Sequence, residues 1–163
     1  MYASRDRLVI FDADGTLIDA FRAVEAAFEH HGMDIGDYRR FQRRRKLLKY
    51  LGGLREFPKN LRRQLDKENR KQLKQTLTDI YRGEAMLFPG AGELLKTLMA
   101  APGIRVGIVS RNVTIDPETT LAIVLERHDI DPEQLDFLRC IPLGDDKADQ
   151  FRAVRRGFDV NPS

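Results

Sequence analysis

The sequence predicts an α/β fold in which a doubly wound parallel sheet carries an all-helical segment inserted after the first strand. Two observations support this prediction. The uninterrupted apolar run 8–11 is typical of a parallel strand that is buried on both faces. After position 87, short apolar runs alternate with helical patterns, whereas residues 18–86 show helical periodicity alone. The strands and the helical insert therefore belong to different structural units.

The insert is expected to hold three helices, because its apolar residues recur at helical spacing and each stretch stops at glycine or at a turn. The expected ranges are 20–31, 38–51 and 60–80. Asp19 is the candidate N-cap of the first helix, and Gly32 would end it. The apolar faces of the three expected helices suit a small helical bundle, and nothing in this stretch has the pattern of a strand.

The rest of the chain returns to alternating strands and helices. Strands are expected at 105–110 and 137–142, and helices at 91–100 and 121–128. Asp116-Pro117 signals the start of the second of these helices, and Asp145 or Asp146 would cap a last helix that presents Phe151 and Val154. Because helices separate the strands, the sheet is expected to be parallel.

Composition restricts the environment and the partners. The single cysteine, Cys140, allows no intramolecular disulfide and suits a reducing compartment, so a cytoplasmic location is expected. No run is long and apolar enough to span a membrane. Basic residues exceed acidic ones within 18–88, whereas acidic residues exceed basic ones in the remainder. The helical insert and the sheet therefore differ in charge.

Asp12 and Asp14 are the strongest candidates for chemistry. They directly follow the first strand, and open α/β sheets bind ligands at the carboxyl ends of their strands. Two neighbouring carboxylates repel one another and raise each other's pKa. A hard cation that prefers oxygen ligands, normally Mg²⁺, is the expected cofactor at such a position.

The run Leu8-Val9-Ile10-Phe11-Asp12-Ala13-Asp14-Gly15-Thr16-Leu17 resembles the first signature of the haloacid dehalogenase-like hydrolases, which is apolar residues followed by Asp-x-Asp-Gly-Thr-Leu. The resemblance implies a Rossmann-like core at 1–17 and 87–163. It also implies a helical cap at 18–86 that selects the substrate, and Mg²⁺-dependent phosphatase activity. The acid at position 14 argues against the dehalogenating members and the transport ATPases of this family.

The resemblance also implies roles for individual residues. Asp12 would attack phosphorus and form an aspartyl-phosphate, and Asp14 would act as general acid and then general base. Mg²⁺ would bind the Asp12 carboxylate and the main-chain carbonyl of Asp14. Ser110, which ends the second expected strand, and Lys147 would hold the phosphoryl oxygens. Further contacts to the substrate are expected from Gly15, Thr16, Arg111 and Asn112.

Lys147 has a competing interpretation. Residues 144–149 also fit the family's fourth signature, in which Asp145 or Asp149 would be the distal metal ligand. Pro142 argues against this, because proline cannot donate to a strand ladder and belongs on an edge strand, whereas the fourth-signature strand lies in mid-sheet. If Lys147 is instead the basic residue of the family's third signature, the strand that carries the fourth signature is not reached, and the core is expected to be truncated at its C-terminus. The first strand would then have a free edge open to self-association, and Mg²⁺ would bind weakly.

The predicted function is Mg²⁺-dependent hydrolysis of a small organophosphate, with little turnover by this short form. A phosphomutase and a non-catalytic protein that binds a phosphate ligand or a partner are the alternatives. The basic residues of 39–49 would attract an anionic substrate or form the solvated faces of cap helices. Nucleic-acid binding is not expected, because no recognised motif accompanies the charge.

Overall fold

The computed structural model describes residues 7–32, 67–142 and 144–160, and its strands form one parallel sheet in the order β1-β2-β3. Helices alternate with the strands along the chain, as the sequence predicts. The elements of the described residues are β1 (Arg7–Phe11), α1 (Ala20–His30), α5 (Lys67–Glu84), α6 (Ala91–Met99), β2 (Ile104–Ser110), α7 (Pro117–Glu126), the short 3-10 helix η2 (Pro132–Gln134), β3 (Phe137–Cys140) and α8 (Lys147–Gly157).

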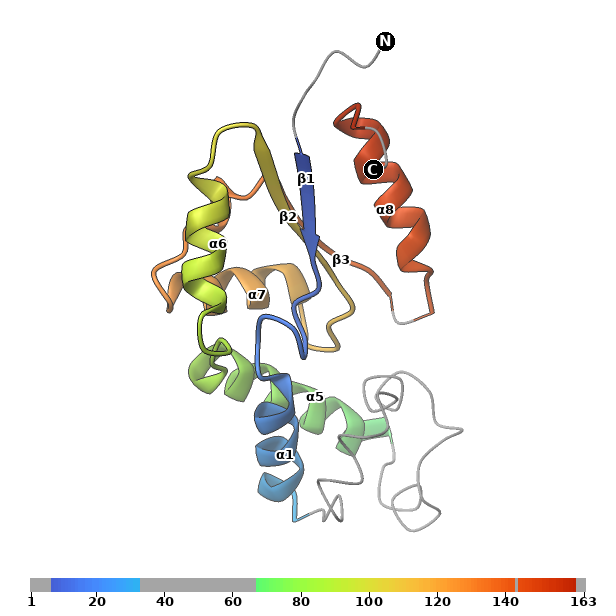
Figure 1. Ribbon diagram of the computed structural model, residues 1–163. Coiled ribbons are helices and arrows are strands. Elements are labelled where there is room, and N and C mark those ends of the chain that lie inside the picture. The colour runs from blue at the N-terminus through green and yellow to red at the C-terminus, as the bar shows by residue number, and fades with distance from the viewer. Residues whose placement is uncertain (1–6, 33–66, 143, 161–163) are drawn as a thin grey trace.

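Helices cover both faces of the sheet (Figure 1). α6 and α7 lie against one face and α8 against the other, while α1 and α5 lie beyond the carboxyl ends of the strands. The predicted α/β class and the parallel sheet are therefore confirmed. Residues predicted for a helix at 38–51, and the basic residues of 39–49, lie outside the described part of the chain.

Burial on both faces explains the continuous apolar strands. Val106 and Ile108 of β2 belong to the cluster that contains Leu95 of α6 and Leu121 of α7. Val109 instead belongs to a second cluster with side chains of β3 and α8. Alternate residues of one strand thus enter two separate apolar layers, which a half-exposed strand with alternating polar residues would not do.

Close packing across the sheet depends on Gly107 of β2. Gly107 pairs in register with Phe137 of β3, and the Phe137 ring occupies the space where a side chain would begin. A Cβ placed on Gly107 would lie only 2.2 Å from the Phe137 ring. The ring also packs against Phe158 just after α8, with ring centroids 5.7 Å apart. The absence of a side chain at position 107 therefore lets one aromatic ring join β2, β3 and the end of α8.

β1 is an edge of the described sheet. It pairs with β2 from Arg7↔Ile104 to Phe11↔Ile108, and its apolar residues are only partly buried. By contrast, β2 is buried over 106–110. The free edge fits the expectation for the first strand, and self-association through it stays a prediction.

The structure differs from the sequence-based expectations at three points. The third strand ends at Cys140, since Pro142 has no N–H with which to continue the ladder. Asp19 occupies the N-cap position of α1, but its side chain makes no capping bond, and its N–H instead donates to the Met86 carbonyl at 2.9 Å. Phe151 of α8 is 39% exposed, so only Val154 of the expected pair is buried.

We predict that Gly107→Ala destabilises the fold by about 1–3 kcal/mol, because the added methyl group must displace the Phe137 ring from a filled layer. Denaturant unfolding measures the change. Gly83→Ala in α5 is the matched control, because nothing lies within 4 Å of the position that its Cβ would take. The double substitution Gly107→Ala/Phe137→Leu should recover part of the loss, and equal stability of Gly107→Ala and the unsubstituted protein would contradict the packing argument.

Candidate active site

The turn after β1 places two carboxylates at the carboxyl edge of the sheet. Asp12 follows β1 directly, and Gly15 has a φ of +77°, a conformation that favours glycine. The Gly15 N–H donates to the Ile18 carbonyl at 2.9 Å, and the Thr16 N–H donates to the Ala13 carbonyl at 3.2 Å. The turn therefore uses both of these amide donors internally, which fixes the backbone on either side of Asp14.

Asp12 has a partner for each of its carboxylate oxygens. Ser110 Oγ, at the end of β2, donates to Asp12 Oδ1 at 3.0 Å. Lys147 Nζ, from the first turn of α8, lies 2.6 Å from Asp12 Oδ2. Ser110 is fully buried, whereas the Asp12 side chain remains 42% exposed. The chain thus brings together the predicted aspartate, serine and lysine while leaving the aspartate accessible from outside.

The start of α8 is fixed by two hydrogen bonds that direct Lys147 toward Asp12. Asp146 is the N-cap of α8, and its carboxylate accepts from the Ala148 N–H at 2.9 Å. Arg111 Nη2 donates to the Asp145 carbonyl at 2.6 Å. The expected contact with the substrate stays a prediction for Arg111, which here holds the loop that precedes α8. Its Nε is buried and has no hydrogen-bond partner within the described residues.

Asp14 is held by donors from two other elements. The Tyr81 hydroxyl, from α5, donates to Asp14 Oδ1. Asn112 Nδ2, in the loop after β2, lies 3.3 Å from Oδ1 and 3.2 Å from Oδ2. Asn112 was predicted as a contact to the substrate, which stays a prediction, whereas Tyr81 was not predicted at all. The only feature of Tyr81 in the sequence is that it follows Leu73 and Leu77 on the apolar face of one helix. An aromatic residue at such a position normally belongs to the hydrophobic core.

The environment of Asp14 changes its acidity. Burial raises the pKa of the Asp14 carboxyl from 3.8 to about 7, and the negative charge of Asp12 adds to this shift. The hydrogen bonds from Tyr81 and Asn112 and the charge of Lys147 act in the opposite direction, so burial prevails. At neutral pH the carboxyl exists in both protonation states, which suits a group that gives and later takes a proton.

Two other titratable groups near this edge remain protonated. Burial raises the pKa of the Tyr81 hydroxyl well above its usual value of 10, and the charge of Asp14 adds to the shift. Burial likewise raises the pKa of the Cys140 thiol to about 12, with a further contribution from Glu118. Since the thiolate is the nucleophilic form, Cys140 is a poor candidate for a nucleophile.

Only a small number of protein groups at this site could bind Mg²⁺ within the described residues. Asp12 presents a half-exposed carboxylate, and Mg²⁺ in phosphoryl-transfer sites is commonly held by one or two carboxylates, substrate phosphate and water. Within 7–32, 67–142 and 144–160 there is no group of three His, Cys, Asp or Glu side chains that could hold a metal ion. Asp149, the alternative distal ligand, pairs with Arg152 at 2.7 Å.

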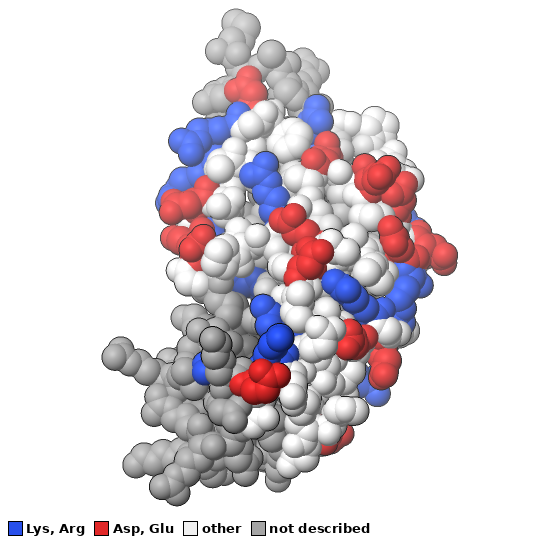
Figure 2. Space-filling view, turned by 180° about the vertical axis from the view of Figure 1, so that it is seen from behind, with Lys and Arg blue, Asp and Glu red and all other residues white. Residues whose placement is uncertain are grey.

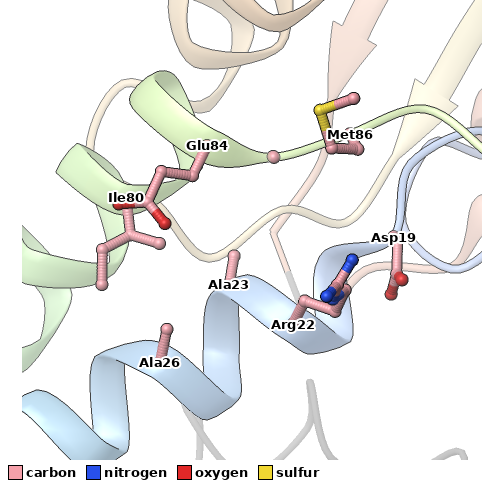
Figure 3. A pocket seen from close by; sticks show the side chains of 8 residues that line it. Asp19, Arg22, Ala23, Ala26, Ile80, Glu84 and Met86 are labelled. Atoms are coloured by element: carbon pink, nitrogen blue, oxygen red, sulfur yellow. The ribbon is translucent and has the colours of Figure 1, made fainter.

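A separate pocket of about 350 Å³ lies between α1 and α5 (Figure 3). The residues that line it are Asp19, Arg22, Ala23, Ala26, Ile80, Glu84, Ala85 and Met86. Asp12, Asp14, Ser110 and Lys147 are not among them, so this pocket is distinct from the carboxylate site. It lies where the chain enters α1 and leaves α5, and its lining mixes small apolar side chains with charges of both signs.

Acidic and basic side chains are interspersed on the face shown in Figure 2. No extended area of one sign dominates the described residues of this face. None of the helices in the described ranges is both long and apolar enough to cross a membrane.

Comparison with known proteins agrees with the geometry. A family model described as haloacid dehalogenase-like hydrolase matches residues 7–163. Among solved structures, a HAD-superfamily hydrolase from Geobacter sulfurreducens has a TM-score of 0.61 at 16% identity, covering 99% of this chain and 78% of that one. A haloacid dehalogenase-like family hydrolase from Streptococcus pneumoniae has a TM-score of 0.57 at 19% identity, covering 97% and 72%.

A third structure, of a Bacillus subtilis protein assigned as a HAD-hydrolase and bound to magnesium, has a TM-score of 0.51 at 17% identity. It covers 83% of this chain and 65% of its own. At these identities the three likenesses concern the fold alone. No curated protein matches the chain.

The parallel α/β core, with Asp12 and Asp14 in the turn after its first strand, agrees with the hydrolase family of the matching model. The chain belongs to the haloacid dehalogenase-like hydrolase family.

We predict that Asp14→Asn changes the pH dependence of stability. The native Asp14 carboxyl, with a pKa of about 7, binds its proton more tightly than the unfolded one, with a pKa of 3.8. Between these values the native state holds more protons, so this group lowers the stability of the unsubstituted protein as pH rises. The stability of Asp14→Asn relative to the unsubstituted protein should therefore increase from pH 4 to pH 7.

Denaturant unfolding at several pH values in buffer with EDTA measures this difference. Asp149→Asn, which removes an exposed carboxylate from α8, is the control and should show no such trend. A stability difference for Asp14→Asn that is independent of pH would contradict the raised pKa.

Proposed function

We propose that this chain is a Mg²⁺-dependent phosphohydrolase that acts on a small organophosphate through an aspartyl-phosphate on Asp12. The observation that carries the proposal is the arrangement around the Asp12 carboxylate. One oxygen lies 2.6 Å from Lys147 Nζ, the other accepts from Ser110 Oγ at 3.0 Å, and the side chain is still 42% exposed. A nucleophile needs this combination of fixed orientation and access.

Charge is the main obstacle to attack by Asp12, since a carboxylate and a phosphate repel one another. Lys147 places a positive charge beside Asp12, and Ser110 offers a hydroxyl at the same edge of the sheet. The Asp12 carboxylate and the Asp14 main-chain carbonyl are the groups that would hold Mg²⁺. The bound ion would supply the additional positive charge that phosphoryl transfer requires.

Asp14 suits the proton transfers of such a reaction. Asp12 would form a bond to phosphorus while the bond to the leaving oxygen breaks, and Asp14 would give that oxygen a proton. In the second step Asp14 would take a proton from water as the water attacks the aspartyl-phosphate, which releases phosphate and restores Asp12. A pKa of about 7 supports both steps, because each needs the opposite protonation state near neutral pH.

The proposal also covers the domain organisation of the chain and its location in the cell. We assign residues 1–17 and 87–163 to the core and 18–86 to a helical cap that selects the substrate. In support, α1 and α5, which are the elements described within 18–86, are both helices. The free thiol of Cys140 supports a cytoplasmic location.

We predict that Asp12→Asn abolishes hydrolysis of p-nitrophenyl phosphate in excess Mg²⁺ while leaving the fold intact. Loss of a covalent nucleophile lowers the rate by about a thousandfold or more. Release of p-nitrophenolate measures the rate, and circular dichroism verifies the fold. Retention of more than about 5% of the activity would exclude Asp12 as the nucleophile.

The matched control addresses the alternative metal ligand. Asp149→Asn also removes one carboxylate, but this carboxylate is exposed and pairs with Arg152. We expect Asp149→Asn to keep the activity and the Mg²⁺ dependence of the unsubstituted protein. A large loss with Asp149→Asn would instead favour the interpretation of residues 144–149 as the acidic fourth signature.

A further inference from the structure

Tyr81 is the one residue of α5 whose side chain bonds to a catalytic carboxylate among the described contacts. Its side chain is almost completely buried, and its hydroxyl donates to Asp14 Oδ1. The two residues are 67 positions apart in the sequence. A phenylalanine would fill the same place on the apolar stripe of α5, so core packing alone does not account for the hydroxyl group.

The part of α5 that carries Tyr81 is bonded to the core on both sides of it. Thr78 Oγ1, one turn before Tyr81, accepts from the Ile115 N–H at 2.8 Å. Arg82 Nε, directly after Tyr81, donates to Thr120 Oγ1 of α7 at 3.0 Å. The Ala85 carbonyl just beyond α5 accepts from Arg127 Nη1 at 3.1 Å. These bonds fix the helix against the loop after β2 and against α7, and so they fix the position of Tyr81 relative to Asp14.

The other donor to Asp14 is oriented in a similar way. The Asn112 side-chain oxygen accepts from the Thr114 N–H at 2.9 Å and from the Thr114 hydroxyl. This turns the Asn112 amide nitrogen toward the Asp14 carboxyl. The Tyr81 hydroxyl bonds to Oδ1 and not to Oδ2, whose described contact is Asn112 Nδ2 at 3.2 Å, so Oδ2 is the oxygen that remains for the transferred proton.

We propose that Tyr81 is a positioning residue that orients Asp14 so that its Oδ2 transfers the proton to the leaving oxygen. This inference rests on the proposed function. In the step concerned, the bond between Asp12 and phosphorus forms, the bond from phosphorus to the leaving oxygen breaks, and that oxygen takes the proton from Asp14 Oδ2. Tyr81 keeps its own proton throughout and does not touch the substrate.

The test compares two substrates that differ little in shape but strongly in leaving group. Phenolate is a much stronger base than p-nitrophenolate, so phenyl phosphate depends on proton donation far more than p-nitrophenyl phosphate does. The value of kcat/KM reports the steps up to release of the phenol. For Tyr81→Phe we expect kcat/KM to fall about tenfold for phenyl phosphate and no more than about twofold for p-nitrophenyl phosphate.

Thr78→Val is the matched control. It removes a hydrogen bond between α5 and the core, as Tyr81→Phe does, but the Thr78 hydroxyl bonds to the Ile115 N–H and the Lys74 carbonyl and not to Asp14. If Thr78→Val lowers kcat/KM, it should do so by the same factor for both substrates. Tyr81→Met serves as a second hydroxyl-free variant if thermal unfolding shows that Tyr81→Phe does not fold.

The outcomes of this experiment test the role of Tyr81 separately from the proposed hydrolysis. A selective loss with phenyl phosphate in Tyr81→Phe and not in Thr78→Val supports the role of Tyr81. Equal losses with both substrates, unchanged values, or faster turnover by Tyr81→Phe would overturn that role while the proposed hydrolysis stands. Absence of hydrolysis by the unsubstituted protein with either substrate in excess Mg²⁺ would overturn the proposed function and this inference together.

Discussion

The repulsion between Asp12 and Asp14 is the constraint on which the arrangement of this site depends. Both carboxylates follow the same strand, and burial raises the pKa of Asp14, with the charge of Asp12 adding to the shift. Neither side chain can be held there without donors, and the turn after β1 supplies none of them from its own side chains. The donors come from β2, the loop after β2, α5 and α8. The fold is therefore required to bring three distant segments, β2 with its following loop, α5 and α8, to one edge of the sheet.

Asp12 and Asp14 have different surroundings, and this difference supports their different proposed roles. Asp12 has a cation as its partner, in Lys147, and stays open to the outside. Asp14 has neutral partners, Tyr81 and Asn112, and is surrounded closely enough that burial dominates its pKa. An accessible carboxylate beside a cation suits a nucleophile, whereas a partly buried one with a pKa of about 7 suits proton transfer. Environment, and not residue type, separates the two proposed roles.

The sequence predicted those parts of the fold and site that follow from local pattern. The apolar runs identified the strands, the end of the first strand identified Asp12, and the family resemblance identified Ser110 at the end of the second. Lys147, which opens the helix after the third strand, was likewise predicted from the family resemblance. Tyr81 was missed because a tyrosine on an apolar helix stripe has no local mark of a long-range contact. The bond from Arg111 to the Asp145 carbonyl was also missed, because only tertiary structure places that carbonyl nearby, and the expected contact of Arg111 with the substrate stays a prediction.

The central claim is that Asp12 becomes covalently phosphorylated, and trapping of the phosphorylated residue tests it most directly. The protein would be mixed with p-nitrophenyl phosphate and Mg²⁺, quenched in acid and treated with borohydride, which reduces an aspartyl-phosphate to homoserine. Mass spectrometry of the peptides then locates the change. We predict homoserine at position 12 and nowhere else, and none in Asp12→Asn. A stable phosphate on Ser110, or turnover without any change at Asp12, would contradict the account.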